Sequence, residues 1–580
     1  MDFLREPAVI ERYRDAPKAK AHGATYTPKA LSDFVAEQIL NAANLSGVDS
    51  PLLVLDPAVG DAELLVSLLE KLDGRGLTIE VHGFETDSKA LDLARGRLER
   101  LFPSVQLRLE PTSFLEFVLD QFGDDGNGTL FRSQMPKAYD LVIANPPYVR
   151  TQIMGSNQAR LLAQRFGLTG RVDLYHAFLI GMSQVIKPSG IAGIIVSNRF
   201  MTIKSGASVR SAIRERFNIH HVWDLGDTKI FDVAVLPAVL VLEGRRDPAA
   251  EVPRFTSIYE TSAASGERVG HAVEALSREG VVELGDGRRF LVRHGRLDCS
   301  GARDAIWRLG TDASDAWLAT VVAHSWGKFR DIGKVRVGVK TCADTVFIRS
   351  DWQQVPEAER PELLRPLTTH HVARQYRALQ PGTRQEILYP HEVVQEQRQA
   401  VDLAAYPRTH AYLEKYRAPL EARKYVLEAG RRWYEIWVPQ DPSAWGKPKL
   451  VFRDIAEEPT FWIDLDGTVV NGDCYWLISE SSNETDLLWL AAAVGNSGFI
   501  KAYYDHRFHN KLYSGRRRFM SQYVEEFPLP DPKSKVGELI IRRTKDVFAD
   551  IGVLGAETLT EDIDRLVWKA FGLAREEAGR

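Results

Sequence analysis

Four consecutive residues, Asn145-Pro146-Pro147-Tyr148, have the types and spacing that point most directly to chemistry. They follow the apolar run 139–144, which is expected to be a buried strand ending at a loop that proline makes stiff. Ligands of open α/β sheets bind at such strand ends. The loop could accept the two N–H groups of a planar amine on the Asn145 side-chain oxygen and the Pro146 carbonyl, with Tyr148 stacked on the aromatic group. An amine held this way would expose its lone pair for attack on a methyl group.

Two other strand ends carry groups suited to a nucleoside-containing cofactor. The apolar run 52–55 is followed by Asp56 and a turn with Gly60, where the backbone can approach a ligand closely. The run 79–84 ends at Glu85, an acid that could accept hydrogen bonds from both hydroxyls of a ribose. An acid in this place can equally be a helix cap, so the interpretation of Glu85 depends on the glycine turn at the matching strand end.

The elements that must position these groups are short apolar strands alternating with amphipathic helices, from about residue 20 to about residue 245. This alternation is typical of a doubly wound sheet. Strands are expected at 52–55, 79–84, 141–144, 191–196, 221–225 and 238–242, and helices at 61–72, 88–101 and 174–186. Beyond about residue 310 the alternation stops, and Trp-rich mixed segments predict an α+β domain.

The predicted fold class is an α/β Rossmann-like domain with a doubly wound, mostly parallel sheet, followed by an α+β domain and a helical C-terminal tail. The stretch 243–267 is rich in Pro, Arg, Ala and Ser and indicates the first boundary. The expected parts are a catalytic domain, a connecting segment, a recognition domain and a tail, at 1–245, 246–320, 321–533 and 534–580.

Composition excludes several classes of protein. With 580 residues, 44% hydrophobic and 26% charged, the chain is expected to be globular with two or three domains. No apolar run reaches the roughly 20 residues that span a bilayer, and the first residues do not resemble a signal peptide, so we expect a cytoplasmic protein without a membrane partner. Three widely spaced cysteines predict neither a disulfide framework nor a zinc site.

Taken together, the motifs resemble those of the gamma-class, TaqI-like DNA adenine-N6 methyltransferases of restriction–modification type. The resemblance rests on the segments 24–28, 56–60, 84–87, 145–148, 173–178, 194–198 and 231–237, in the order that defines the class. It implies S-adenosyl-L-methionine as the cofactor and double-stranded DNA as the substrate, with the target adenine extruded into the loop at 145–148. In this family the aromatic residue matching Phe231 helps to enclose the adenine.

The resemblance also implies which residues form the site. The implied catalytic residues are Asn145, Pro146, Tyr148 and Phe231. The implied cofactor-binding residues are Thr25, Tyr26, Thr27, Asp56, Ala58, Gly60, Glu85, Thr86, Ser113, Phe114, Asn145 and Pro147. Two positions depart from the family pattern: Ala62 stands where a glycine is usual, which predicts slight crowding, and Ser113 stands where an aspartate is usual, which predicts a weaker, uncharged bond to the adenine of the cofactor.

Two basic and aromatic segments, 423–434 and 501–518, suit contacts with DNA phosphates and bases. The family's recognition domain resembles the segments 337–348, 432–435, 447–450, 496–497, 515–518 and 527–530. The predicted DNA-binding residues are Arg431, Arg432, Trp433, Lys449, Arg516, Arg517 and Arg518. The three adjacent arginines are the strongest phosphate candidates, because they repel one another unless an anion is near. Any one of these residues could instead belong to a solvated face.

The sequence leaves three functions open. The first is site-specific methylation of adenine N6 in double-stranded DNA. The second keeps methyl transfer but changes the substrate to RNA or a protein glutamine, because the loop presents any planar amine equally well; the large basic C-terminal domain favours DNA. The third is a methyltransferase-like DNA-recognition subunit of a defence complex with weak or no turnover, for which Ser113 is the only support.

Neither a metal nor a fused nuclease is predicted. Methyl transfer from a sulfonium to an amine needs no Lewis acid, and the histidines at 370–371, 506 and 509 lack companion cysteines at zinc spacing. About twenty residues precede the first cofactor segment, which leaves no room for an amino-terminal nuclease domain. A cognate restriction endonuclease would therefore be a separate chain, and we expect a monomer.

Overall fold

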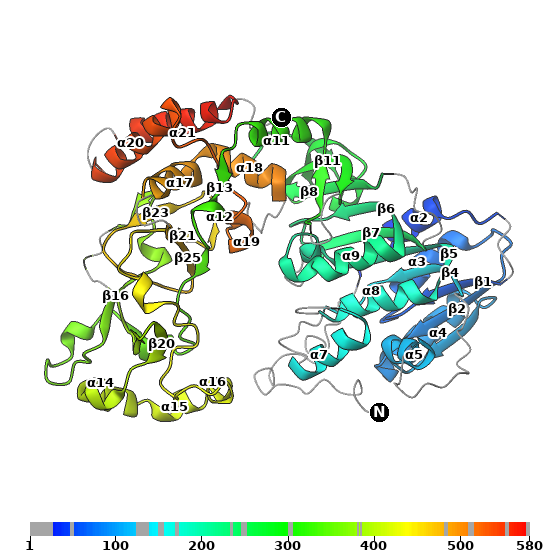
Figure 1. The fold of residues 1–580 in the computed structure, drawn as a ribbon. Coiled ribbons are helices and arrows are strands. Elements are labelled where there is room, and N and C mark those ends of the chain that lie inside the picture. Colours follow the sequence, from blue (N-terminus) through cyan, green and yellow to red (C-terminus); the bar gives the residue numbers. More distant parts are fainter. Residues whose placement is uncertain are drawn as a thin grey trace. The chain divides into compact units, whose positions relative to one another are not determined.

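The computed structural model describes residues 27–46, 51–122, 138–148, 156–168, 173–231, 236–244, 252–299, 305–379, 382, 385–480, 485–508, 516–550 and 556–575. The chain divides into two compact units. The amino-terminal unit comprises residues 1–311 and 512–515, and the carboxy-terminal unit comprises residues 312–511 and 516–580. Figure 1 labels the elements of both units.

A parallel sheet forms the centre of the amino-terminal unit. Its first five strands lie in the order β3 (Gln106–Glu110), β2 (Ile79–Phe84), β1 (Leu52–Asp56), β4 (Tyr139–Ala144) and β5 (Ile186–Ser197), and neighbours are parallel throughout. The next strand, β7 (Pro237–Gly244), is antiparallel to both β5 and β6 (Phe217–Asp224) and lies between them. The structure thus confirms the predicted doubly wound, mostly parallel sheet.

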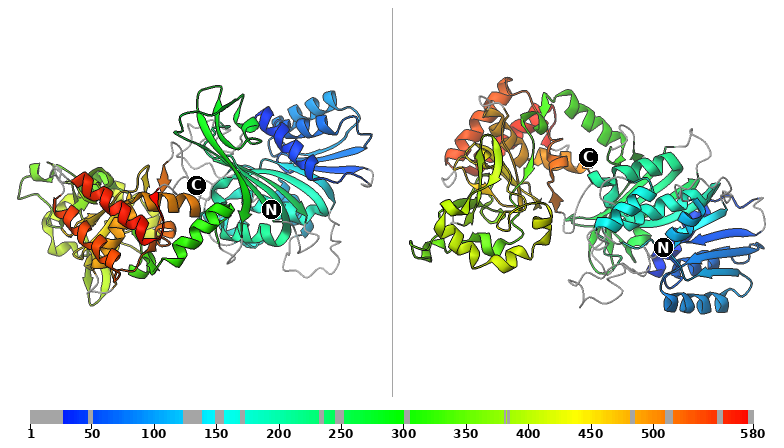
Figure 2. Two further views of the ribbon diagram at one scale, coloured as in Figure 1. Left: turned by 90° about the horizontal axis from the view of Figure 1, so that it is seen from above. Right: turned by 60° about the horizontal axis from the view of Figure 1, so that its bottom comes forward.

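The same sheet continues through the part of the chain where the sequence predicts a connecting segment. Strand β8 (Arg254–Glu260) pairs in parallel with β6, and β11 (Arg289–Asp298) pairs antiparallel with β8. Strands β10 (Gly280–Leu284), β9 (Glu267–Val269) and β12 (Arg308–Gly310) complete it. Figure 2 shows these strands lying side by side, coloured from blue through cyan to green.

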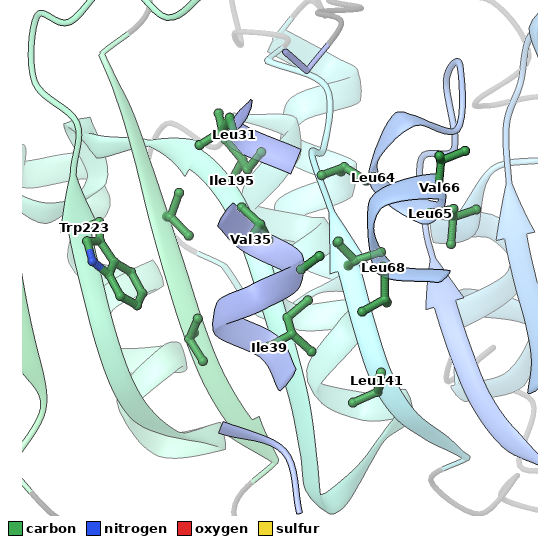
Figure 3. Close-up of a cluster of buried hydrophobic side chains, with 14 of the residues drawn as sticks. Leu31, Val35, Ile39, Leu64, Leu65, Val66, Leu68, Leu141, Ile195 and Trp223 are labelled. Atoms are coloured by element: carbon green, nitrogen blue, oxygen red, sulfur yellow. The ribbon is translucent and has the colours of Figure 1, made fainter. Parts of the chain in front are cut away.

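Helices cover both faces of this sheet. One face carries α2 (Lys29–Ala42), α3 (Glu63–Leu72) and α4 (Ser88–Leu101), whose leucines and valines form one apolar cluster with the strands. In Figure 3, Leu31, Val35 and Ile39 of α2 lie over the sheet beside Leu141 and Ile195. The other face carries α5 (Phe114–Phe122), α7 (Ser156–Arg165), α8 (Leu174–Val185) and α9 (Ala207–Arg216). Burial on both faces explains why the strands read as nearly continuous apolar runs.

Two small sheets form the centre of the carboxy-terminal unit, in agreement with the predicted α+β class. The first contains β14 (Arg336–Val337), β25 (Cys474–Leu477), β21 (Lys449–Arg453), β23 (Phe461–Asp464) and β17 (Tyr376–Arg377). The second contains β15 (Ile348–Arg349), β18 (Glu386–Leu388), β16 (Leu364–Thr368) and β24 (Val469–Val470). Buried tryptophans fill the space around them, including Trp352, Trp445, Trp462 and Trp476.

The predicted C-terminal helices are α20 (Lys535–Asp550) and α21 (Ala556–Ala570), and they pack on this unit. The rings of Phe499 in α18 (Gly498–Phe508) and Phe571 stack with centroids 4.2 Å apart. Trp568 contacts the edge of Phe499 at 5.4 Å. Among the helices that the structure describes, none combines the length and apolar character needed to cross a bilayer.

Candidate active site

Four of the predicted groups lie at one edge of the sheet. Strands β1 to β4 are parallel neighbours, so their carboxyl ends meet there. Asp56 ends β1, and Glu85, Ser113 and Asn145 follow β2, β3 and β4. The strand order changes direction between β1 and β4, and α/β sheets bind their ligands at such a switch point.

The turn after β1 has a strained and close-fitting backbone. Gly60 has φ +53° and Ala62 has φ +64°, the left-handed region that a side chain makes unfavourable by roughly 1–2 kcal/mol. Ala62 is also fully buried. A Cβ on Gly83 of β2 would lie 2.5 Å from Cγ2 of Val59, so only glycine fits beside this turn. The sequence did not single out Gly83, because the clash involves a neighbouring strand.

Asp56 is buried and only half satisfied. Its Oδ1 accepts the N–H of Ala58 at 2.9 Å, and its Oδ2 has no hydrogen-bond partner among the described residues. Burial raises the pKa of Asp56 to about 7, and the nearby charges of Glu85 and Asp61 add to the rise. A buried acceptor without a partner is uncommon in a folded protein, and one at the carboxyl end of β1 suits a bound donor or cation.

Glu85 joins the first two strand ends. Its Oε2 accepts the N–H of Gly60 at 3.1 Å, and its Oε1 accepts the N–H of Asp87 at 2.9 Å and the hydroxyl of Thr86 at 3.4 Å. The side chain is half-buried, and Thr86 is exposed. Because a carboxylate has about four acceptor positions, Glu85 retains capacity for a ribose hydroxyl while it holds the glycine turn.

The structure places Ser113 and Phe114 at the start of α5. The Ser113 hydroxyl accepts the N–H of Leu115 at 3.2 Å, which is the bond of a helix cap. Phe114 is fully buried, with its ring 5.6 Å from that of Phe84 and 5.8 Å from that of Phe178. Both residues lie near the end of β3, where the cofactor prediction requires them, but Phe114 is part of the core here.

The loop after β4 is tied to the segment that precedes α2. Nδ2 of Asn145 donates to Oγ1 of Thr27 at 3.0 Å, which joins two residues that the sequence assigned to the same site from positions 118 apart. This bond fixes the orientation of the amide. Pro146 is buried and Pro147 is half-buried. Thr25 and Tyr26 lie outside the described residues.

Tyr148 packs on the face of the sheet that α8 covers. Its ring meets that of Tyr175 edge-on, with centroids 6.3 Å apart, and its buried hydroxyl has no partner among the described residues. Burial raises the pKa of Tyr148 far above its ordinary value. His176 lies beside Tyr175, at 4.3 Å between ring centroids, and neither of its ring nitrogens has a described partner. Burial lowers the pKa of His176 to about 3, so the imidazole is neutral.

No role for His176 is predicted from the sequence, although a histidine inside an apolar helix is a usable signal. For Phe231, in contrast, the family resemblance predicts a role in enclosing the target adenine. Phe231 is buried in the apolar cluster of the α2 face, whereas Tyr148 packs on the cluster of the opposite face.

Three predicted DNA-binding residues are ion-paired inside the carboxy-terminal unit. Lys449 is fully buried, lies 3.0 Å from Asp464 and donates to the carbonyl of Trp445 at 2.8 Å. Arg517 is buried and holds Asp505 through two bonds of 2.8 and 2.7 Å. Arg518 pairs with Asp454 at 3.0 Å.

Arg431, Arg432 and Trp433 also have partners within the fold. Arg431 donates to the carbonyl of Trp437 at 2.6 Å and lies over its ring. Arg432 donates to the Tyr434 hydroxyl at 2.7 Å, and the ring of Trp433 is covered by Arg417 at 5.0 Å. Arg516 is exposed. Of the arginine run at 516–518, it is the residue that the structure presents most openly to solvent.

The fold and this edge define a class of protein. A parallel sheet in the order 3-2-1-4-5, an antiparallel β7 beside β5, and a glycine turn with an acid at the switch point are the features of a Rossmann-like methyltransferase domain. The sequence matches two family profiles: Eco57I restriction-modification methylase over residues 90–231, and TaqI-like C-terminal specificity domain over residues 386–529.

Individual relatives extend over almost the whole chain. The type II methyltransferase M.BanIII of Aneurinibacillus aneurinilyticus is 36% identical over 577 residues, covering 96% of this chain and 98% of the relative. M.XhoI of Xanthomonas vasicola, another type II methyltransferase, is 25% identical, covering 96% and 98%. A solved structure of a nuclease-deletion mutant of the type ISP restriction-modification enzyme LlaGI has a TM-score of 0.54 at 11% identity, covering 91% of this chain and 54% of that one.

The chain therefore belongs to the type II methyltransferases of restriction–modification systems, and it carries a TaqI-like specificity domain. This confirms the resemblance found in the sequence. Its cofactor is S-adenosyl-L-methionine. The edge fits such a group, because the unpartnered Oδ2 of Asp56 and the half-buried Glu85 offer acceptors beside a turn at which the backbone is free of bulky side chains.

Proposed function

We propose that this protein methylates the N6 amine of adenine in double-stranded DNA, with the base extruded from the duplex into the loop at 145–148. The observation that carries the proposal is the bond from Asn145 to Thr27, which orients the amide at the end of β4. With Nδ2 directed to Thr27, the side-chain oxygen of Asn145 is the atom suited to accept an N–H from the target amine. The family membership supports the same reaction.

The reaction uses two acceptors and one aromatic surface of this chain. Oδ1 of Asn145 and the carbonyl of Pro146 accept the two N–H groups of the adenine amine, which draws the nitrogen lone pair out of conjugation with the ring. S-adenosyl-L-methionine supplies the methyl group from its sulfonium centre. As the new N–C bond forms and the bond from the methyl group to sulfur breaks, the amine becomes cationic and its N–H bonds to the two acceptors strengthen. The loop thus stabilises the transition state more than the ground state, and the methylated amine then loses one proton to solvent as the neutral thioether leaves.

Tyr148 has to support the extruded base by stacking. Its ring follows the two prolines after β4 and meets that of Tyr175 edge-on. The carboxy-terminal unit would select the sequence around the adenine, since residues 386–529 match a specificity domain. Arg516 is its most exposed predicted contact. This division of roles corresponds to the predicted catalytic and recognition domains.

One experiment tests the proposal. The purified protein is incubated with unmethylated genomic DNA and S-adenosyl-L-methionine, and modified bases are mapped by single-molecule sequencing. N6-methyladenine within one short motif is expected. Transfer to cytosine, RNA or protein alone, or specific DNA binding with no transfer, contradicts the proposal.

Two variants separate catalysis from folding. Asn145→Ala removes an acceptor for the target amine, and we expect a loss of transfer of roughly 100-fold or more, with DNA binding largely retained. Thr27→Val removes only the bond that orients the Asn145 amide, so it should reduce transfer by a smaller factor. Equal loss of transfer and binding in Asn145→Ala would show that the residue is structural.

A further inference from the structure

An exposed arginine lies beside the loop at 145–148. Strand β5 is parallel to β4, with Ala144 at the end of β4 opposite Ile194, and β5 continues to Ser197 before it leaves the sheet at the same edge. Arg199 comes two residues after the end of β5, in the short helix η2 (Asn198–Met201), and is exposed. It is near the aromatic residues of the site: burial raises the pKa of Tyr175 strongly, and the positive charge of Arg199 opposes that rise.

The backbone that carries Arg199 is fixed from the sheet side. The Asn198 side-chain amide donates to Oδ1 of Asp224 at 2.8 Å, and the Tyr259 hydroxyl donates to Oδ2 of the same carboxylate at 2.7 Å. The N–H of Asn198 donates to the carbonyl of Leu236 at 2.9 Å. Asn198 and Asp224 are both buried. A buried carboxylate with these donors holds the first residue of η2 in place.

A buried arginine fixes the same segment from the helix side. Arg210 of α9 donates through Nη1 to the carbonyls of Phe200 at 2.6 Å and Ile203 at 2.9 Å, and through Nε to the carbonyl of Ala305 at 2.8 Å. It is 1% exposed. The backbone on both sides of Arg199 is therefore anchored, although the Arg199 side chain points to solvent.

Several arginines of the amino-terminal unit have acidic partners, whereas Arg199 has none among the described residues. Arg308 pairs with Asp298 at 2.9 Å and Arg97 pairs with Glu63 at 2.6 Å. The guanidinium of Arg199 forms no ion pair or hydrogen bond with a described residue. An exposed guanidinium on a fixed backbone loses little entropy when it binds, and its planar fork matches a phosphate.

We propose that Arg199 binds a backbone phosphate of the target strand next to the extruded nucleotide. This inference rests on the proposed function. A base leaves the duplex by rotation about its own backbone, which brings the flanking phosphates to the mouth of the site. Arg199 follows the strand next to that of Asn145 at the same edge of the sheet, and its charge acts on Tyr175, whose ring meets that of Tyr148. Its contact would hold the nucleotide in the extruded state and is independent of sequence.

The test combines a protein variant with a change in the DNA. Arg199→Ala is compared with the unaltered protein on duplexes in which one phosphate flanking the target adenine is replaced by a neutral methylphosphonate. Extrusion is followed by the fluorescence of 2-aminopurine at the target position, and binding by titration. If the contact exists, the neutral linkage and Arg199→Ala each weaken binding by about tenfold, and together they weaken it no further.

Salt dependence gives a second measurement. Arg199→Ala should reduce the slope of log K against log salt by about 0.9, and Arg199→Lys should retain the slope because it keeps the charge. Arg100→Ala is the matched control: Arg100 is exposed near the end of α4, which runs from the carboxyl end of β2 to the amino end of β3, so it lies at the opposite edge of the sheet. It should leave both slope and extrusion unchanged.

The outcomes separate this inference from the proposed function. If the unaltered protein methylates no adenine in DNA, the proposed function fails. If it methylates adenine but the effects of Arg199→Ala and the neutral linkage are additive at both flanking phosphates, the phosphate assignment to Arg199 is overturned. Unchanged melting temperature and unchanged calorimetric binding of S-adenosyl-L-methionine are expected in Arg199→Ala. A lowered melting temperature with an unchanged salt slope would also overturn it, because the residue would then be structural.

Discussion

Buried polar groups at the sheet edge of the amino-terminal unit differ from the buried basic residues of the carboxy-terminal unit in whether they have partners. At the edge, Oδ2 of Asp56 and the hydroxyl of Tyr148 are buried without a described partner. Among the predicted DNA-binding residues of the carboxy-terminal unit, Lys449 and Arg517 are buried and held by carboxylates. Unsatisfied polar groups destabilise a fold and persist where a ligand completes them, whereas a paired cation stabilises the fold around it.

This contrast separates two kinds of sequence signal. A polar residue at the end of a buried strand is placed by the strand itself, so its location follows from the local sequence. A cluster of basic residues carries no such geometric constraint, and its members can turn inward to carboxylates that are distant in the chain, as Arg518 does with Asp454. Clusters of charge therefore predict DNA contacts less directly than strand ends predict a ligand site.

The strongest test of the contrast removes a buried cation. Lys449→Ala leaves Asp464 buried without its partner, and the free energy of unfolding should fall by about 3–5 kcal/mol. Chemical denaturation measures this change, with Lys447→Ala, at an exposed position, as the matched control. A stable Lys449→Ala protein that has lost only DNA affinity would show that Lys449 serves recognition instead.

Asp56→Asn should have the opposite effect on stability. The pKa of Asp56 is raised from 3.8 to about 7, so the unfolded state loses its proton first as the pH rises, and the native state is disfavoured fully above pH 7. An asparagine does not have to be ionised in a buried position, although it buries an unpaired N–H. The free energy of unfolding of Asp56→Asn should therefore be higher than that of the unaltered protein by about 1–3 kcal/mol at pH 8.

Thermal unfolding of Asp56→Asn at several pH values measures this gain. The difference from the unaltered protein should shrink as the pH falls from about 7 toward 4. Calorimetry should show weaker binding of S-adenosyl-L-methionine at the same time. A variant that is destabilised at pH 8 would mean that the carboxylate is satisfied in the folded protein.

Tyr148→Phe tests whether the second unpartnered group acts in the reaction. Removing a buried hydroxyl that has no partner should raise the free energy of unfolding by about 1 kcal/mol. Because the ring still stacks, transfer should stay within a few-fold of the unaltered rate, as measured by methyl incorporation. A large loss of transfer would assign a role to the hydroxyl itself.

The smallest stability effect is expected for Arg516→Ala. Its side chain is exposed, so the free energy of unfolding should change by less than about 0.5 kcal/mol. The salt slope of DNA binding should fall by about 0.9 if it contacts a phosphate. Arg517→Ala is the informative comparison, because it should lower the free energy of unfolding when Asp505 loses its partner. Equal salt slopes of DNA binding in the two variants would contradict the view that Arg516 contacts DNA and Arg517 does not.

Much of the amino-terminal fold could be predicted because its strands are apolar on both faces. The runs before Asp56, Glu85 and Asn145 are continuous and end sharply, so both the strands and the site at their ends followed from the sequence. Strands β8 to β12 could not be predicted in the same way. β11 alternates buried residues such as Phe290 and Val292 with charged ones, and its place in the sheet depends on pairing with distant strands.

The site itself was predictable in its positions and less so in its contacts. Residues Asp56, Glu85 and Asn145 meet at one edge as expected, and Thr27 joins them. The capping bond of Ser113 and the full burial of Phe114 depend on how α5 packs, which no local pattern records. Likewise, the need for Gly83 arises from side chains of two other elements.

Asn198 has a consequence for redesign of this enzyme. Its side chain donates to Asp224, the last residue of β6, and its backbone N–H donates to the carbonyl of Leu236, the residue before β7. The N–H of Leu225 also donates to the Pro237 carbonyl at 3.0 Å. The ends of this connection are thus joined independently of the residues between them. Lengthening such a segment by a few residues adds only a small loop entropy, so the connection is a suitable place to graft a different sequence.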